Sequence, residues 1–208
     1  MSDSNQNVCR RCRVEKTKLF LKGNKCLTDK CPVERRAYAP GQHGRARRRI
    51  LGYGIQLREK QKLKRYFGMT EKQFRLFFKR AEQKKGITGE NLLVALERRL
   101  DNVVYLMGFS ESRSQARLLI NHGHFLVNER RVNVPSYPVE VGNVIAFGER
   151  SVQSKYLKAM VDGHKGKTLP GWLEVDRDSM TGRVLALPTR ANVTLPVEEH
   201  LVVELYSK

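Results

Sequence analysis

The positive charge of this chain is concentrated in its first 90 residues. The 208 residues include 40 Lys and Arg against 21 Asp and Glu, a formal net charge of +19. Residues 1–50 carry +10 and residues 51–90 carry +7, whereas residues 91–160 carry +3 and residues 161–208 carry −1. A compact fold with this surplus repels itself unless a polyanion neutralises it. The pattern therefore favours nucleic-acid binding over a solvated Lys/Arg face or an anionic membrane surface.

Neither a membrane span nor an export signal is visible in the sequence. The longest apolar run, Val103 to Phe109, has seven residues and includes a Gly, too short to cross a bilayer. The first seven residues, MSDSNQN, contain no apolar stretch, so we expect no secretory signal. We expect a soluble chain that stays in the compartment where it is made.

All four cysteines lie between positions 9 and 31. Cys9 and Cys12 form a C-x2-C pair, and Cys26 and Cys31 form a C-x4-C pair. Two such pairs supply the four thiolates of a tetrahedral zinc site and leave no open position for catalysis. Without an export signal, disulfides are disfavoured; an iron–sulfur cluster commonly uses other spacings, and unligated core cysteines rarely cluster this way. The pattern predicts one structural Zn²⁺.

A basic arm follows the cysteines. Residues 39–49 read APGQHGRARRR. The Pro and Gly residues disfavour a packed helix, and the arginines favour an extended arm that lies along phosphates. We interpret His43 as a polar contact within this arm rather than a fifth metal ligand.

The middle of the chain is typical of a small helical bundle. Residues 55–67 favour a helix, with five basic residues facing outward. Thr70 and Gln73 form a capping box at the start of another helix, and a third runs from Thr88 to about Arg99. Apolar side chains of the second helix recur at helical spacing and predict core packing rather than a base-stacking platform. They are Phe74, Phe77, Phe78 and Ala81.

Residues 110–147 read as a helix followed by a short-stranded sheet. Ser112 is a good N-cap, with Gln115 three residues later. Arg113 and Arg117 lie four residues apart, so they share a helix face, and the helix N-terminus is suited to phosphate binding. Strands are expected at residues 124–127, at residues 131–134 after a turn near residues 128–130, and at residues 144–147. A small basic sheet beside a helix suits the recognition of folded RNA by its shape.

These residues carry a resemblance to a known family. The segment SRSQARLLINHGHFLVN at residues 112–128 resembles the RNA-binding module named after the fourth protein of the small ribosomal subunit. PGQHG at 40–44, LREKQKLK at 57–64, LDNVVY at 100–105 and EHLVVELYS at 199–207 extend the resemblance over nearly the whole chain, and the cysteines match the zinc-bearing bacterial form. One departure is Glu129, where family members often have Gly after Asn128; Glu tolerates a positive φ less well.

The resemblance implies a function in translation. It implies a cytoplasmic, structural constituent of the small ribosomal subunit that binds 16S rRNA at a helix junction of the 5′ domain. Such a protein nucleates assembly of the 30S body and contributes to translational accuracy. The implied partners are the fifth small-subunit ribosomal protein and mRNA where it enters the subunit, with no membrane and no small-molecule substrate.

We expect an α+β fold in three parts. Residues 1–50 form the four-cysteine zinc site and the basic arm, and residues 51–98 form a helical domain completed by a C-terminal return at 161–208. Residues 99–160 form an inserted RNA-binding module of one helix and a small antiparallel sheet. The RNA-binding candidates are Arg10, Arg11, Arg13, His43, Arg45, Arg47, Arg48, Arg49, Arg58, Lys60, Lys62, Lys64, Arg65, Ser112, Arg113, Ser114, Gln115, Arg117, His122, His124 and Arg131.

Two other classes of protein are less compatible with the sequence. The same module occurs in RNA-modifying enzymes, but these need a separate catalytic domain, and only 48 residues follow position 160. No Ser/His/Asp set or paired carboxylates stand out, so we expect no enzyme. A DNA-binding zinc protein needs a recognition helix near the metal, and residues 27–36, which contain Pro32, offer no long helix.

Overall fold

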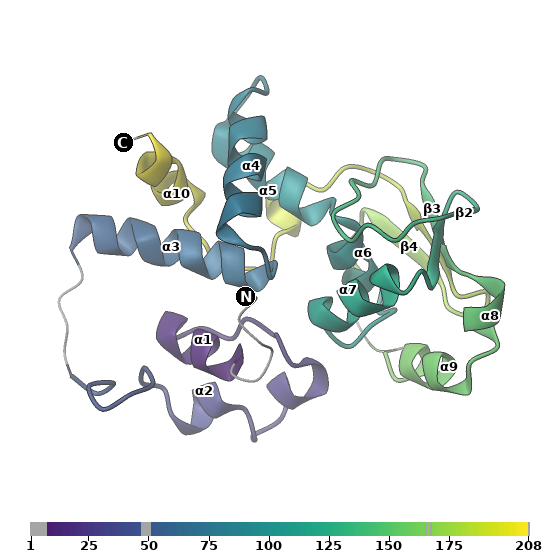
Figure 1. Cartoon of the computed structure of the whole chain (residues 1–208), viewed down its shortest axis with the longest axis horizontal. Coiled ribbons are helices and arrows are strands. Elements are labelled where there is room, and N and C mark those ends of the chain that lie inside the picture. Colours follow the sequence, from purple (N-terminus) through teal and green to yellow (C-terminus); the bar gives the residue numbers. More distant parts are fainter. Residues whose placement is uncertain (1–7, 47–50, 165, 167, 208) are drawn as a thin grey trace. The chain divides into compact units, whose positions relative to one another are not determined.

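The computed structural model describes residues 8–46, 51–164, 166 and 168–207 (Figure 1). The chain divides into two compact units. The first unit comprises residues 1–76 and 195–208, and the second comprises residues 77–194. No helix among the described residues is both long and apolar enough to cross a membrane.

The first unit is helical. Its elements are α1 (Val8–Glu15), the 3-10 turn η2 (Gly23–Cys26), α2 (Pro32–Arg35), α3 (Gly52–Tyr66), the first half of α4 (Glu71–Glu82) and α10 (Glu199–Tyr206). The C-terminal α10 packs against α3 (Figure 1). Leu63, Phe67 and Phe74 are fully buried in this unit, and the ring of Phe74 stacks on that of Tyr206 at 6.3 Å.

The start of α4 confirms a local prediction. The Gln73 backbone N–H donates to Oγ1 of Thr70, and the Thr70 N–H donates to Oε1 of Gln73, both at 3.3 Å. This is the reciprocal arrangement of a capping box. The apolar stripe of α4 also faces inward, because Phe74, Phe78 and Ala81 are buried. The stripe is therefore core, as its spacing predicts.

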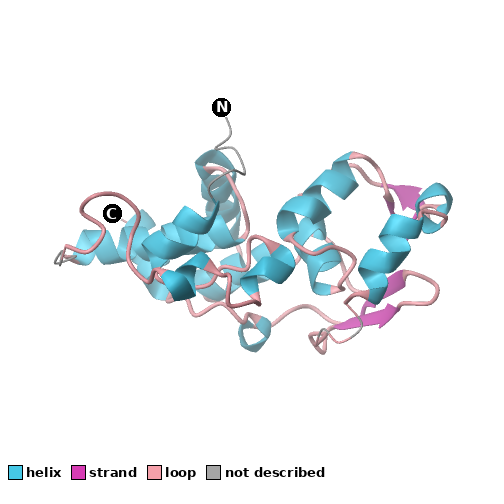
Figure 2. Ribbon diagram, turned by 90° about the horizontal axis from the view of Figure 1, so that it is seen from below, coloured by secondary structure: helices cyan, strands magenta, loops and turns pink. Residues whose placement is uncertain are grey.

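The second unit combines helices with one sheet. After the second half of α4, its helices are α5 (Thr88–Glu97), α6 (Leu100–Leu106), α7 (Arg113–Asn121), α8 (Glu149–Val152), α9 (Lys155–Asp162) and the 3-10 turn η3 (Arg190–Asn192). Its strands, magenta in Figure 2, are β1 (Phe125–Val127), β2 (Arg130–Arg131), β3 (Val144–Phe147), β4 (Leu173–Asp176) and β5 (Thr181–Val184).

Within the described residues, these strands form one antiparallel sheet in the order β2-β1-β3-β5-β4. The register pairs Leu126 with Ala146 between β1 and β3, and Ile145 with Gly182 between β3 and β5. Gly182 leaves space for α6, because a Cβ at this position would come within 2.6 Å of the Met107 sulfur. A larger residue here would require the side chain of Met107, at the C-terminal end of that helix, to shift.

One hydrophobic core joins the sheet to its helices. Phe109, Phe125 and Phe147 form an aromatic cluster, with ring centroids 4.4 Å apart for the last two. Residues of α6, α7 and α9 pack against the same core. At about 25 cal/mol per Å² of buried apolar surface, such a cluster is the main source of the unit's stability. The sequence-predicted combination of helix and antiparallel sheet is confirmed.

The extent of the sheet differs from the expectation. Strands β4 and β5 lie within residues 161–194, which the sequence analysis assigned to the C-terminal return. In the structure only the segment from Leu195 onward belongs to the unit that contains α3. The reason is non-local pairing: Thr181 to Arg183 pair with Val144 to Ala146 across more than 30 residues of chain.

The β1–β2 hairpin has the tight turn that the sequence indicates. Val127 pairs with Arg130, so Asn128 and Glu129 form a two-residue loop. Their φ angles are +48° and +66°, as a type I′ turn requires. Glu129 thus occupies a left-handed conformation that favours glycine.

Candidate nucleic-acid interface

The four cysteines lie on the small helices of the N-terminal knob, residues 8–38. Cys9 and Cys12 are on α1, Cys26 ends η2 and Cys31 immediately precedes α2. All four are free thiols, and three of them are buried. The backbone N–H of Lys22 donates to the Cys26 sulfur at 3.3 Å. Burial raises the pKa of Cys12 to about 11, and the other three cysteines are near enough to add to this shift.

The expected zinc centre is not seen. Within the described residues, which include all four cysteines, no group of three or more His, Cys, Asp or Glu side chains is arranged to hold a metal ion. The helix-and-sheet part of the predicted fold class is present, but the metal part remains a prediction.

Two of the candidate arginines hold the arm to the knob. Arg13 donates from Nε to the Tyr38 carbonyl at 3.0 Å, and its guanidinium lies 5.1 Å from the centroid of the Tyr38 ring. Arg45 lies 4.8 Å from the same ring, and its hydrogen bond lowers the pKa of Tyr38. Arg13 therefore anchors the chain after α2. On the knob surface, Arg10 is exposed and Arg11 is half-buried.

The described part of the arm is not extended. Gly44 N–H donates to the Gly41 carbonyl and Ala46 N–H to the His43 carbonyl, both at 3.1 Å, so residues 41–46 form consecutive turns. Glycine is required in this segment, because a Cβ on Gly44 would clash with the Ala39 carbonyl. His43 and Arg45 are exposed on these turns. Arg47, Arg48 and Arg49 lie outside the described residues.

The basic residues of α3 are paired with carboxylates, which the sequence analysis did not expect. Glu15 binds Arg58 and Arg65, Glu59 binds Lys62, and Glu71 binds Lys60 and Lys64. The Lys60 side chain is largely buried, with Nζ 2.5 Å from Glu71 Oε1. Paired cations are less available to phosphates, because an incoming anion must compete with the resident carboxylate.

The Arg113 side chain is buried and forms contacts within the protein. It is only 5% exposed, and its Nε donates to Oδ1 of Asn102 at 2.8 Å. Its guanidinium lies 4.4 Å from the centroid of the Tyr105 ring. The sequence placed Arg113 on an exposed phosphate-binding face; in this structure the helix directs it into the protein, and that interpretation is corrected.

Arg117 is half-buried and held by a carboxylate. Its Nη2 lies 2.6 Å from Oδ2 of Asp101, and its Nε donates to the same oxygen at 3.2 Å. Arg99 binds both oxygens of that carboxylate, at 3.0 and 2.8 Å. One buried Asp thus neutralises one of two guanidinium groups, so a net positive charge remains here. The RNA-binding role of Arg117 stays a prediction.

The start of α7 is capped as predicted, with one difference. Ser112 Oγ accepts the Gln115 N–H at 3.3 Å. The Gln115 side chain accepts the N–H of Glu111 at 2.8 Å, one residue before the N-cap, and donates to Tyr156 Oη at 3.0 Å. Of the two serines, Ser114 is the exposed one. The backbone N–H groups at the start of α7 are therefore partly satisfied by a neighbouring side chain.

A further group of candidates lies at the other end of α7. His122 ends the helix, His124 precedes β1 and Arg131 lies on β2. The two imidazole rings are 6.3 Å apart with planes inclined by 28°, and Arg131 donates to the His122 carbonyl at 3.1 Å. The structure thus brings these three predicted residues together.

The outer face of α4 presents basic residues beyond those predicted from the sequence to bind RNA. Opposite the buried Phe stripe, this helix and the turn after it expose six basic residues, Lys72, Arg75, Lys79, Arg80, Lys84 and Lys85. Lys79 and Arg80 form no ion pair with any carboxylate that the structure describes. The sequence does contain a signal for this surface. In α4 and the turn after it, most residues outside the apolar stripe are Lys or Arg.

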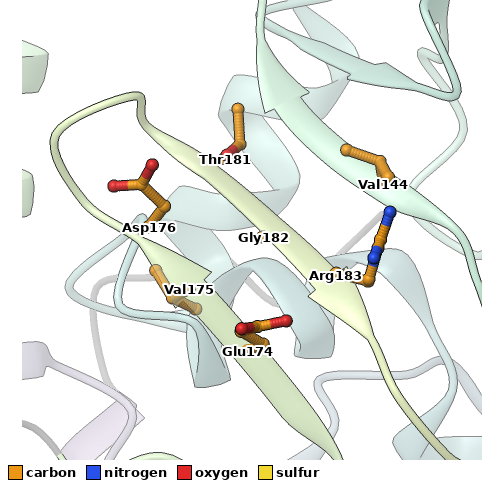
Figure 3. Close-up of a pocket in the computed structure, with 7 residues that line it drawn as sticks. All are labelled: Val144, Glu174, Val175, Asp176, Thr181, Gly182 and Arg183. Atoms are coloured by element: carbon orange, nitrogen blue, oxygen red, sulfur yellow. The ribbon is translucent and has the colours of Figure 1, made fainter.

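The outer face of the sheet has a surface hollow of about 260 Å³ (Figure 3). Glu174 and Asp176 of β4 and Arg183 of β5 line it. Two carboxylates against one guanidinium make this hollow a poor phosphate site. The cationic surfaces of the helices and of the β1–β2 hairpin are therefore the better candidates for an RNA interface.

Comparisons with known proteins show which family the chain belongs to. Residues 4–97 match the family described as the ribosomal protein S4/S9 N-terminal domain, and residues 98–145 match the S4 domain. The chain is 54% identical over 202 residues to the small ribosomal subunit protein uS4 of Pelotomaculum thermopropionicum, covering 97% of each chain. It is 55% and 56% identical to the uS4 proteins of Ruminiclostridium cellulolyticum and Caldicellulosiruptor bescii, over 96% of each chain. The chain therefore belongs to the uS4 family of small ribosomal subunit proteins.

Proposed function

We propose that this chain is a structural constituent of the small ribosomal subunit that binds 16S rRNA directly, at a helix junction of the 5′ domain. In this role it nucleates assembly of the 30S body and contributes to translational accuracy. Full-length similarity to uS4 proteins supports the assignment, and a ribosomal family excludes the enzyme alternative. The protein acts by holding RNA helices at fixed angles, which lowers the entropy cost of later assembly steps.

The observation that carries the proposal is the distribution of unpaired cations. The basic residues of α3 are neutralised within the chain, whereas Lys79, Arg80 and Arg131 have no carboxylate partner among the described residues. Exposed cations of this kind contact phosphates and release condensed counterions. RNA binding by many such contacts relieves the self-repulsion of a chain of net charge +19.

The test is co-sedimentation of the native protein with small ribosomal subunits, together with binding to a 16S rRNA 5′-domain transcript at several salt concentrations. We expect the logarithm of the affinity to fall linearly and steeply with the logarithm of salt concentration. Protection of one junction in footprinting is expected as well. A protein that does not sediment with the subunit and binds the transcript no better than an unrelated duplex contradicts the proposal.

We also propose that Cys9, Cys12, Cys26 and Cys31 hold one structural Zn²⁺. The donor set supports this, since four soft thiolates from two short-spaced pairs suit zinc. The knob keeps all four as free thiols in one small segment, and the Lys22 N–H already donates to the Cys26 sulfur. Such N–H donors orient a sulfur ligand and offset its charge. Zinc, when bound, would tie α1, η2 and α2 together.

Native mass spectrometry and hydrogen exchange test the metal proposal. The native protein is expected to carry one zinc ion, and Cys26→Ser is expected to lose it and to lose exchange protection in residues 8–38. Lys25→Met, one residue away, is the control that keeps the metal. A native protein with four alkylatable thiols and no bound zinc contradicts the proposal, and RNA binding is measured separately.

For a protein partner, the support is a set of exposed apolar side chains at the start of α3. Leu51, Tyr53 and Ile55 are 68%, 64% and 45% exposed. Large apolar and aromatic side chains are enriched where a protein surface contacts another protein. We propose that these side chains contact the fifth small-subunit ribosomal protein, and that mRNA passes near the subunit surface that the two proteins share. Tyr53→Ser is expected to weaken binding of that protein while 16S rRNA affinity stays unchanged.

A further inference from the structure

The turn between α7 and β1 builds a small site from three side chains of the second unit. The cluster consists of His122, His124 and Arg131, and Gly123 lies between the two histidines. Each member is fixed by a different contact, and together they present an aromatic ring and a guanidinium to solvent.

His124 is the rigid base of the cluster. Its Nδ1 is 2.9 Å from the Oγ of Ser151, a buried residue of α8. Burial lowers the pKa of His124, and nearby His122 and Arg131 lower it further. The ring is therefore neutral at physiological pH, and it is held in one orientation by the hydrogen bond.

His122 forms the outer layer. It is exposed, and its ring lies roughly parallel to that of His124, with centroids 6.3 Å apart and an interplanar angle of 28°. Its backbone is also fixed, because its carbonyl accepts a hydrogen bond from Arg131 Nη2 at 3.1 Å. Gly123 has φ +70°, and a Cβ there would come within 2.1 Å of Arg131 Nε. Only glycine lets the guanidinium lie across this turn.

The cluster is cationic and has no acid partner among the described residues. Arg131 is exposed and forms no ion pair with any carboxylate in the described part of the chain. This differs from Arg117, whose guanidinium is held by Asp101. Arg131 is thus an exposed cation beside the exposed ring of His122.

We propose that this cluster binds a single unpaired nucleotide, with the base stacked on the His122 ring and the adjacent phosphate paired with Arg131. The inference rests on the proposed function and assigns the chemistry of one subsite within it. Unstacked bases of folded RNA stack on His as well as on Phe, Tyr and Trp. A double-helical segment offers only phosphates here, since its base faces are covered, so the pre-stacked ring favours an unpaired base.

Salt dependence separates the two halves of the site. The probe is the 16S rRNA 5′-domain transcript, bound by the full chain and by His122→Ala, His122→Phe and Arg131→Met. His122→Ala is expected to weaken binding roughly 5- to 150-fold, the range of base–aromatic stacking, with an unchanged salt slope. His122→Phe keeps the affinity within a few-fold. Arg131→Met lowers both the affinity and the salt slope, the slope by about 0.7–0.9.

Asn121→Ala, an exposed neighbour at the end of α7, is the matched control and should bind like the wild type. Circular dichroism melting of each variant checks that the fold is kept. Unchanged affinity of His122→Ala overturns the inference. An equal loss of affinity for His122→Phe and His122→Ala also overturns it. So does a reduced salt slope for His122→Ala. Either outcome would mean that the site is only a phosphate contact. These results leave the proposed function standing, whereas failure of the wild type to bind the transcript overturns that function itself.

Discussion

The Nε of Arg113 donates a hydrogen bond to Oδ1 of Asn102, at 2.8 Å, inside the second unit. Asn102 in turn donates from Nδ2 to Oε2 of Glu97 at 2.5 Å and to the Glu97 carbonyl at 3.0 Å. Burial raises the pKa of Glu97, and the positive charge of Arg113 opposes that shift. The first residue of α7 is thus tied through one amide to the end of α5.

Removing Arg113 is expected to damage the fold. Arg113→Met leaves the Asn102 oxygen unpaired and Glu97 without its nearby cation, and breaking such a buried network costs about 2–4 kcal/mol. Urea denaturation followed by circular dichroism measures the loss. Arg130→Met, an exposed arginine of β2, is the control and should unfold like the wild type. If Arg113→Met keeps the wild-type stability but binds RNA more weakly, Arg113 is an RNA contact rather than a member of a buried network.

Glycine at position 129 is expected to stabilise the hairpin. Glu129 has φ +66°, and the left-handed region costs a non-glycine residue about 1–2 kcal/mol. The greater flexibility of Gly in the unfolded chain offsets part of this gain, so Glu129→Gly should raise the free energy of unfolding by about 0.5–1 kcal/mol. Glu129→Ala removes the charge and keeps the strain. A gain of equal size in the Ala variant would show that the charge, not the backbone, is responsible.

Glu71 makes the first unit sensitive to acid. Partial burial favours the neutral carboxyl, but hydrogen bonds from Lys60 and Lys64 outweigh this and lower the pKa of Glu71 from 4.5 to about 2. A carboxylate with a depressed pKa stabilises the fold above its ordinary pKa and loses that contribution as pH falls. The urea midpoint should therefore fall between about pH 4.5 and about pH 2 through this group.

The comparison of Glu71→Gln with the wild type isolates this contribution. The variant should be less stable at neutral pH and should show a flatter loss over the same acid range. Glu82→Gln, an exposed position on the same helix, should keep the wild-type profile. If Glu71→Gln and the wild type lose stability in parallel from pH 4.5 to 2, the lysine contacts of Glu71 do not contribute to folding.

Local signals predicted α3, α4, α5 and α7. The capping box at Thr70 and Gln73 and the buried Phe stripe of α4 are fixed by residues within one or two turns, so spacing alone finds them. The strand at residues 144–147 and the turn at Asn128 were predicted for the same reason.

What the sequence could not predict depends on distant partners. β5 is short and contains Gly182, and it is a strand because it pairs with β3 on one side and with β4 on the other. Trp172 is buried in the same core without any periodic pattern around it. The ion pairs of charged side chains also depend on distant partners. From the sequence, Arg65 is predicted to be an unpaired cation, but in the fold it pairs with Glu15, which lies 50 residues earlier in the chain.

The outer face of α4 is expected to contribute more to RNA binding than the basic face of α3. Lys79 and Arg80 are exposed and unpaired among the described residues, so a phosphate can bind them without displacing a carboxylate. Replacing both with Met should lower the slope of log affinity against log salt by about 1.5, because each lost phosphate contact removes about 0.7–0.9. Lys62→Met, whose partner Glu59 lies 2.5 Å away, is the matched control with a smaller effect. Both variants keep the buried face of their helix, so melting curves should match the wild type. An equal or larger change of slope for Lys62→Met would mean that the ion pairs of α3 open on binding and that RNA contacts this helix directly.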